Sequence, residues 1–155
     1  MSKRGVPVET AIKSKSRPIR VLLVDDHPVV LQGLKFLLEQ EQMSIRAVAN
    51  SLETLAAVEA DRPDLALVDL SLGEEDGTAF VAKLCNLALP SIAYSIHEDQ
   101  RHVKNALAAG ALGYVTKREV HRVLVQAIFE VANGGRFNSP KAAKALAEQD
   151  SAESD

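Results

Sequence analysis

Short apolar runs alternate with stretches of helical periodicity along this chain, and each kind of segment recurs five times. A short continuous apolar run is typical of a strand buried on both faces, whereas apolar residues three and four positions apart indicate an amphipathic helix. The expected strands span residues 19–24, 45–49, 65–68, 92–95 and 112–115. The expected helices span residues 29–40, 52–60, 77–87, 99–109 and 120–131. Such an alternation favours an α/β fold with an open parallel sheet that helices cover on both faces.

Right-handed crossover connections leave few ways to wind such a sheet. Each of the two common doubly wound strand orders places functional groups at the carboxyl ends of the strands, where the winding direction switches. In the order 2-1-3-4-5 the first and third strands are neighbours. A chain of 155 residues suits one domain of this kind with a full hydrophobic core.

Three aspartates lie at the expected carboxyl ends of the first and third strands. Asp25 and Asp26 follow the first apolar run, and Asp69 follows the third. If these strands are neighbours, the three carboxylates lie close together, and their repulsion requires protonation or a bound cation. Oxygen ligands with room for water favour Mg²⁺. Each acid could instead cap a helix, and Asp26 before His27 and Pro28 has the position for that role.

The fourth and fifth expected strands end in a hydroxyl and a cation. Ser95 ends the fourth strand, and Lys117 follows Thr116 at the end of the fifth. A lysine ammonium can bind a phosphoryl oxygen, and a serine hydroxyl can donate a hydrogen bond to it. Taken singly, the lysine could be a solvated surface residue and the serine a cap. The ordered combination of all four strand ends predicts a site for phosphoryl chemistry.

Four motifs carry a family resemblance: VLLVDDHPVV, LALVDLSLGEEDG, SIAYS and GALGYVTK. They resemble the motifs of bacterial two-component response-regulator receiver domains, and the resemblance covers residues 19 to about 134. The continuation LVQAIFEVANGGRFNSPKAAKAL is similar to the NarL/FixJ (LuxR-type) branch, in which a DNA-binding domain normally follows a linker. The resemblance implies a flavodoxin-like, doubly wound (βα)5 fold with a five-stranded parallel sheet of order 2-1-3-4-5.

The resemblance also implies a set of metal and phosphate ligands. Asp69 matches the phosphorylated aspartate, Asp26 a direct Mg²⁺ ligand, and Asp25 an acid that holds the metal largely through water. The backbone carbonyl of Ser71 would complete the protein's metal ligands, and Mn²⁺ could replace Mg²⁺. Lys117 matches the phosphate-binding lysine.

A conformational switch is a further implication of the resemblance, in which Ser95 matches the switch hydroxyl and Tyr114 the switch aromatic. A sensor histidine kinase would present a phosphohistidine, Ser95 would move towards the new phosphoryl group, and Tyr114 would swing inward. The surface of the fourth helix, fifth strand and fifth helix would then change shape. The chain would thus be a phosphoprotein of signal transduction and transcription regulation that catalyses only its own phosphorylation and dephosphorylation.

The chain departs from the family pattern in the loops near the expected site. Gly73 replaces a frequent proline four residues after the acceptor, and residues 74–76 add three acidic groups. Arg118 follows Lys117 where many receivers have proline. The isomer of that peptide bond stays open at this point.

The segments outside residues 19–134, the expected receiver domain, differ from it in composition. Residues 1–18 are basic and aperiodic, which predicts a flexible tail, and residues 135–155 begin as an Ala-rich helix, which predicts a C-terminal extension or linker. A DNA-binding effector domain would be absent from this chain, and a stand-alone adaptor without such output is the alternative. No run approaches the ~20 apolar residues of a membrane span, so we expect a cytoplasmic protein. The net charge of −3 gives no reason to expect direct contact with nucleic acid.

Four single residues have open interpretations. Val125 and Phe129 lie off the main apolar stripe of the last helix, and they could form a homodimer strip or pack against the C-terminal extension. His97 is either a plain surface histidine or, by the resemblance, a residue that tunes phosphoryl hydrolysis. Cys85 is the single cysteine, which excludes an intramolecular disulfide, and we expect it to be a small core residue.

Two other functions use comparable residues. Mg²⁺-dependent phosphatases that form an aspartyl phosphate typically need a second aspartate two residues after the nucleophile, and this chain has Ser71 there. A flavodoxin-like flavin site needs a loop rich in Gly, Ser and Thr after the first strand. In this chain Asp25 and Asp26 stand there and would repel a flavin phosphate.

Overall fold

The computed structural model describes residues 17–71 and 76–154 of the chain. Strands and helices alternate throughout these residues. In chain order they are β1 (Ile19–Val24), α2 (Pro28–Glu39), β2 (Met43–Val48), α3 (Ser51–Ala60), β3 (Leu65–Asp69), α4 (Gly77–Asn86), β4 (Ser91–Ser95), α5 (Gln100–Ala108), β5 (Gly113–Thr116), α6 (His121–Ala132), β6 (Phe137–Asn138) and α7 (Pro140–Ser154). Ten of these elements correspond to the ten expected segments, with ends that differ by one or two residues.

The described residues form a single parallel sheet of six strands, in the order β2-β1-β3-β4-β5-β6. The expected order of the first five strands is confirmed, but the expected number of five was wrong. The sixth strand has only two residues and no apolar run, so periodicity gives no signal for it. It is held by backbone hydrogen bonds instead, in which the amide of Phe137 donates to Leu112 and that of Ser139 to Tyr114.

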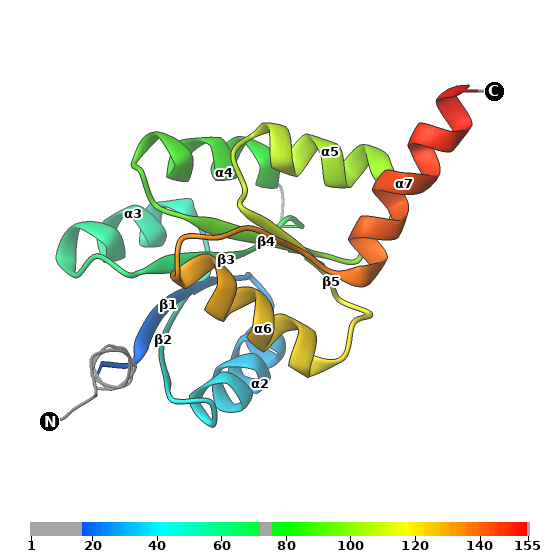
Figure 1. The fold of residues 1–155 in the computed structure, drawn as a ribbon. Helices are drawn as coiled ribbons and strands as arrows, with labels where there is room; N and C mark the ends of the chain where they lie inside the picture. The colour runs from blue at the N-terminus through cyan, green and yellow to red at the C-terminus, as the bar shows by residue number, and fades with distance from the viewer. Residues whose placement is uncertain (1–16, 72–75, 155) are drawn as a thin grey trace, which may run out of the picture.

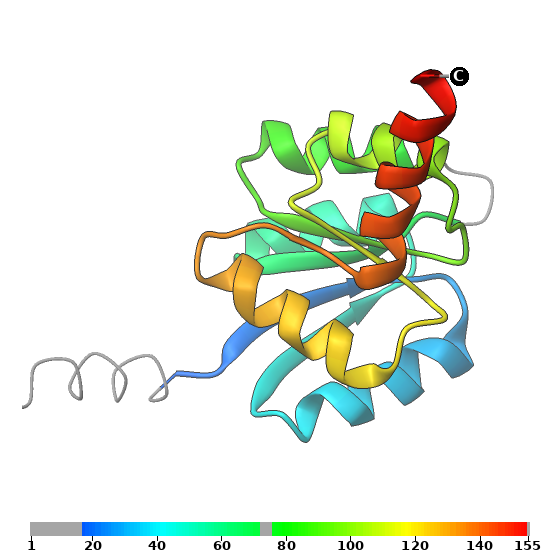
Figure 2. The ribbon, with the colours of Figure 1, turned by 45° about the vertical axis from the view of Figure 1, so that its right-hand side comes forward.

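Helices cover both faces of the sheet, as Figure 1 shows. Helices α3, α4 and α5 lie over one face, and α2 and α6 lie over the other (Figures 1 and 2). Each face has its own apolar core, and strand residues alternate between the two. On β1, for example, Leu22 and Val24 belong to the first core, whereas Val21 and Leu23 belong to the second. The alternation explains why the central strand β3 is apolar on both faces from Leu65 to Val68.

Helix α7 leans against α5 at the β6 edge of the sheet (Figure 2). Its small residues Ala142 and Ala145 are buried in the same core as α5. The side-chain amide of Gln100 at the start of α5 donates to the carbonyl oxygen of Leu146, 3.4 Å away. Strand β6 and helix α7 therefore add to the core, and the domain boundary expected at residue 134 stays a prediction.

On α2, Leu34 and Leu38 are buried and Leu37 is exposed. The burial expected for Cys85 was wrong, and one of the two interpretations of Val125 is excluded. Cys85 is exposed and not a core residue. Val125 is buried in the second core, so it does not form an exposed strip with Phe129.

Candidate functional site

The strand registers bring the expected carboxyl ends to one rim of the sheet. Val24 of β1 is level with Val68 of β3, so Asp25 and Asp69 follow at the same height. On the other side of β3, Asp69 is level with Tyr94, which places Ser95 and the end of β5 beside them. The four strand ends named by the sequence therefore meet as predicted.

Two of the three aspartates are buried at this rim, with exposures of 1% for Asp25 and 2% for Asp69. Three carboxylate oxygens there, Asp25 Oδ2, Asp26 Oδ1 and Asp69 Oδ2, are buried and accept no hydrogen bond. The pKa of Asp25 is raised, mainly because the carboxyl group is buried. The hydrogen bonds from His27 lower this pKa in part, and the charge of Asp69 raises it further. Buried carboxylate oxygens without donors fit a divalent cation such as Mg²⁺, which binds oxygen ligands.

Lys117 brings a fixed positive charge to the same oxygens. Its Nζ lies 3.2 Å from Asp69 Oδ2 and 3.9 Å from Asp25 Oδ2. Its backbone amide donates to the carbonyl oxygen of Ser95 at 2.8 Å, which fixes the start of its loop to β4. The described residues contain no cis peptide bond, so the bond between Lys117 and Arg118, left open above, is trans.

His27 is a site residue that the sequence reasoning missed. Its Nδ1 lies 2.8 Å from Asp25 Oδ1, 3.1 Å from Asp26 Oδ1 and 3.6 Å from Asp69 Oδ2. The hydrogen bond with Asp25 raises the pKa of His27, and the nearby carboxylate charges add to this. His27 itself occupies the N-cap position of α2, so the alternative role of Asp26 as that cap was wrong. The sequence could have indicated this position. His27 stands between an acid at a strand end and a proline of the first helical turn, and such a residue lies at the rim.

The two residues matched to the switch are both buried behind the rim. Ser95 Oγ accepts a hydrogen bond from the amide of His97 at 3.0 Å. The hydroxyl of Tyr114 donates to the carbonyl oxygen of His97 at 2.8 Å, and the tyrosine is fully buried. The ring therefore already points inward here.

The loop after β3 is described only in part. The amide of Ser71 donates to Asp69 Oδ1 at 3.0 Å, which leaves the other carboxylate oxygen of Asp69 towards Lys117. Gly73 and the acidic residues 74 and 75 lie outside the described residues. Asp76 caps α4 by accepting hydrogen bonds from the amides of Thr78 and Ala79.

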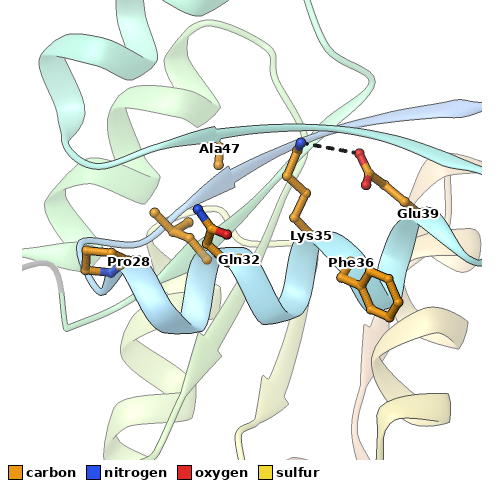
Figure 3. A pocket seen from close by; sticks show the side chains of 7 residues that line it. Pro28, Gln32, Lys35, Phe36, Glu39 and Ala47 are labelled. Carbon is orange, nitrogen blue, oxygen red and sulfur yellow. Dashed lines mark ion pairs between the residues drawn. The ribbon is translucent and has the colours of Figure 1, made fainter.

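A surface pocket lies between α2 and the edge strand β2, which contributes Ala47, and one end of the pocket is next to the rim (Figure 3). It has a volume of about 350 Å³ and begins at Pro28, directly after His27. Its lining combines the exposed ring of Phe36 with the ion pair of Lys35 and Glu39, whose charged atoms are 3.6 Å apart. The pocket thus offers an apolar surface with polar groups next to the aspartates.

Relatives of known sequence resemble this chain over most of its length. The protein is 30% identical to the methanol utilization control regulatory protein MoxX of Paracoccus denitrificans over 90% of this chain and 66% of that one. It is also 30% identical to the transcriptional regulatory protein UhpA of Escherichia coli, over 83% of this chain and 66% of UhpA. The chain spans about half to two thirds of the length of such curated relatives.

The solved structures agree with these relatives. A two-component response regulator of the LuxR family from Aurantimonas superposes with a TM-score of 0.81 at 31% identity, over 86% of this chain and 98% of that one. A CheY-like response regulator receiver domain protein from Methanospirillum hungatei superposes with a TM-score of 0.68 at 30% identity. The match covers 75% of this chain and 94% of that one. Within the described residues no helix has the length and apolarity to cross a membrane. The pattern of the response regulator receiver domain matches residues 21–129, and the chain belongs to that family.

Proposed function

We propose that this receiver accepts a phosphoryl group on Asp69 from the phosphohistidine of a sensor histidine kinase. One observation carries the proposal: three carboxylate oxygens at the rim are buried and accept no hydrogen bond, and Lys117 Nζ lies 3.2 Å from one of them, Asp69 Oδ2. The buried carboxylates favour a bound metal ion, and the metal ion together with Lys117 favours a ligand with negatively charged oxygens. Asp25, Asp26, Asp69 and the carbonyl oxygen of Ser71 would hold Mg²⁺, or Mn²⁺ in its place.

The residues around Asp69 prepare one of its oxygens for attack. Ser71 N–H donates to Oδ1, so Oδ2 is the oxygen that would form the new bond to phosphorus. As that bond forms, the bond from phosphorus to the histidine nitrogen breaks, and the released imidazole takes a proton from water. Lys117 neutralises the transferred oxygens, and bound Mg²⁺ supplies the remaining charge neutralisation that in-line phosphoryl transfer needs.

The proposed output uses Ser95 and Tyr114. A phosphoryl oxygen at Asp69 would accept a hydrogen bond from the hydroxyl of Ser95, and a movement of Ser95 towards it would disturb the bond that Ser95 Oγ accepts from the amide of His97. Because Tyr114 donates to the carbonyl of the same His97, the two residues are linked through one peptide segment. The surface of α5, β5 and α6 would then be the two-state element, which controls a DNA-binding effector domain or, in a stand-alone adaptor, a partner protein.

The proposal is tested by labelling of the whole chain with acetyl phosphate. Wild-type protein should take up about one phosphoryl group per chain with Mg²⁺ and none with a chelator, whereas D69N should take up none. D61N is the matched control, because Asp61 is an exposed acid that pairs with Arg20 away from the rim. Undiminished, Mg²⁺-dependent labelling of D69N would refute the assignment, and continuous release of phosphate from simple esters would favour a phosphatase.

The pocket of Figure 3 supports a docking role for α2 in transfer from the kinase. Pro28 and Phe36 lie ~12 Å apart along α2, so a partner that covers the whole pocket would reach from Phe36 to the end of the helix next to the aspartates. F36D should slow phosphoryl transfer from a phosphorylated kinase at least tenfold and leave labelling by acetyl phosphate unchanged. L52D is the control, since Leu52 is also an exposed apolar residue but lies on α3, across the sheet. Equal slowing of both phosphodonors by F36D would contradict the docking role.

A further inference from the structure

A second group of metal-binding side chains lies outside the aspartate rim, at the amino end of α5. His97 comes from the loop after β4, Asp99 is the N-cap of α5, and His102 lies in its first turn. Each of the three side chains offers one ligand atom, and these three atoms all lie within 4.8 Å of one another. Nδ1 of His102 is 2.8 and 2.9 Å from the two carboxylate oxygens of Asp99.

Helix capping explains only part of this group. Asp99 accepts a hydrogen bond from the amide of His102 at 3.2 Å, as an N-cap residue should. The ring of His97, however, has no part in the cap, and yet it stacks on that of His102 with ring centres 3.8 Å apart and planes 7° apart. Imidazole is a common metal ligand, so two histidine rings in contact beside a carboxylate bring three potential ligands together.

We propose that His97, Asp99 and His102 form a binding site for a transition-metal cation of the zinc class. Two imidazoles and one carboxylate match an open zinc site, with three protein ligands and water in the remaining position. Metal–ligand bonds of about 2.0–2.2 Å place donor atoms ~3.3 Å apart, so the two stacked rings must turn until one nitrogen of each faces a common point beside the carboxylate of Asp99. The rings of His97 and His102 are partly exposed, which leaves room for that rotation.

The chemistry of the ligands separates this site from the aspartate rim. The rim offers mainly carboxylate oxygens, which suit Mg²⁺, whereas imidazole nitrogens favour Zn²⁺, Ni²⁺ and Cu²⁺. His27 is the one histidine among the described rim residues, so its contribution must be tested separately. The chain provides a matched control as well, since His121 at the start of α6 belongs to neither group.

The metal would act on the proposed switch through His97. The amide of His97 donates to Ser95 and its carbonyl accepts from Tyr114, so a ligated His97 would hold both contacts in place. Zinc should then alter the affinity of Asp69 for a phosphoryl mimic, and the mimic should alter the affinity for zinc by the same factor. This step rests on the proposed function, whereas metal binding itself does not.

Calorimetric titration of the tag-free chain with ZnCl₂, in saturating Mg²⁺, tests the site. Wild type should bind one zinc ion, H97A and H102A should each bind at least ~10-fold more weakly, and H121A and H27A should match wild type. Circular dichroism identifies any variant that does not fold, and H97N and H102N then replace it. If the H97 and H102 variants bind like wild type, or if H27A alone loses affinity, the proposed site is wrong.

The coupling has its own measurement. Beryllofluoride binding with and without zinc should differ at least threefold in wild type and not in H102A. An unchanged affinity would overturn the coupling. Zinc binding by D69N separates the two proposals, because it should persist even if Asp69 proves not to be the phosphoryl acceptor.

Discussion

Lys117 is the nearest fixed cation to the oxygen of Asp69 that we expect to attack phosphorus. Replacing it by glutamine removes positive charge that both attracts the phosphoryl oxygens and repels a metal ion. K117Q should therefore reduce the rate of labelling by acetyl phosphate at least tenfold, while Mg²⁺ binding is retained or strengthened. R118Q is the control, because the exposed Arg118 lies 3.7 Å from Glu98 and not at the rim. Loss of Mg²⁺ affinity in K117Q would contradict this division of roles.

His27 places a ring nitrogen among the three carboxylates that we expect to bind the metal. The imidazole and the metal compete for the same oxygens. H27A should therefore bind Mg²⁺ several-fold more tightly than wild type in a calorimetric titration at neutral pH, whereas H121A should not differ. Weaker binding by H27A would mean that the ring supports the metal site.

Asp76 links residue chemistry to pH-dependent stability. Its hydrogen bonds with Thr78 and with the amide of Ala79 lower its pKa in the folded chain. As the pH falls, the unfolded chain takes up this proton first, so the stabilisation is present above about pH 4 and is lost below it. D76N retains an N-cap acceptor but does not titrate, and D76A should cost about 1 kcal/mol at pH 7.

Urea unfolding from pH 3 to pH 7 measures the effect of these changes at Asp76. Wild type should lose stability relative to D76N only at the acid end of the range. A constant difference between the two proteins would show that the carboxylate charge does not contribute through the cap.

Two helical glycines should respond oppositely to alanine. A Cβ on Gly77, at the start of α4, would clash with the backbone of Leu70, so G77A should destabilise the fold by about 1–3 kcal/mol. A Cβ on Gly33, inside α2, would meet nothing within 4 Å, and G33A should stabilise it by about 0.5–1 kcal/mol. Thermal and urea unfolding measure both. Destabilisation by G33A would mean that the surface of α2 packs differently.

The elements could be predicted from sequence wherever packing and periodicity agree. Strands such as β1, buried on both faces, give continuous apolar runs, and the strand ends therefore also located Asp25 and Asp69. Strand β6 could not be predicted, because only backbone hydrogen bonds define it. The burial of Val125 and the exposure of Cys85 depend on tertiary contacts that a helical pattern does not record.

At the scale of the whole molecule, the C-terminal residues contribute to the common core. Ala142 is fully buried beside α5, so A142E should lower the free energy of unfolding by about 2 kcal/mol or more. K144E alters an exposed residue of the same helix, and it should change the free energy of unfolding by less than about 0.5 kcal/mol. Equal stability of A142E and wild type in urea would show that the domain ends near residue 134, as composition suggested.

The bond from the amide of Ser139 to the carbonyl of Tyr114 has a mechanical consequence. Helix α7 starts one residue later, and its 15 residues extend about 22 Å from that anchor. Any tilt of the anchoring peptide is therefore magnified along the helix, and a rotation of roughly 5° would carry its far end about 2 Å. Because Ala142 and Ala145 of α7 are buried in the same core as α5, a tilt of β5 would be passed to α7 and α5 together.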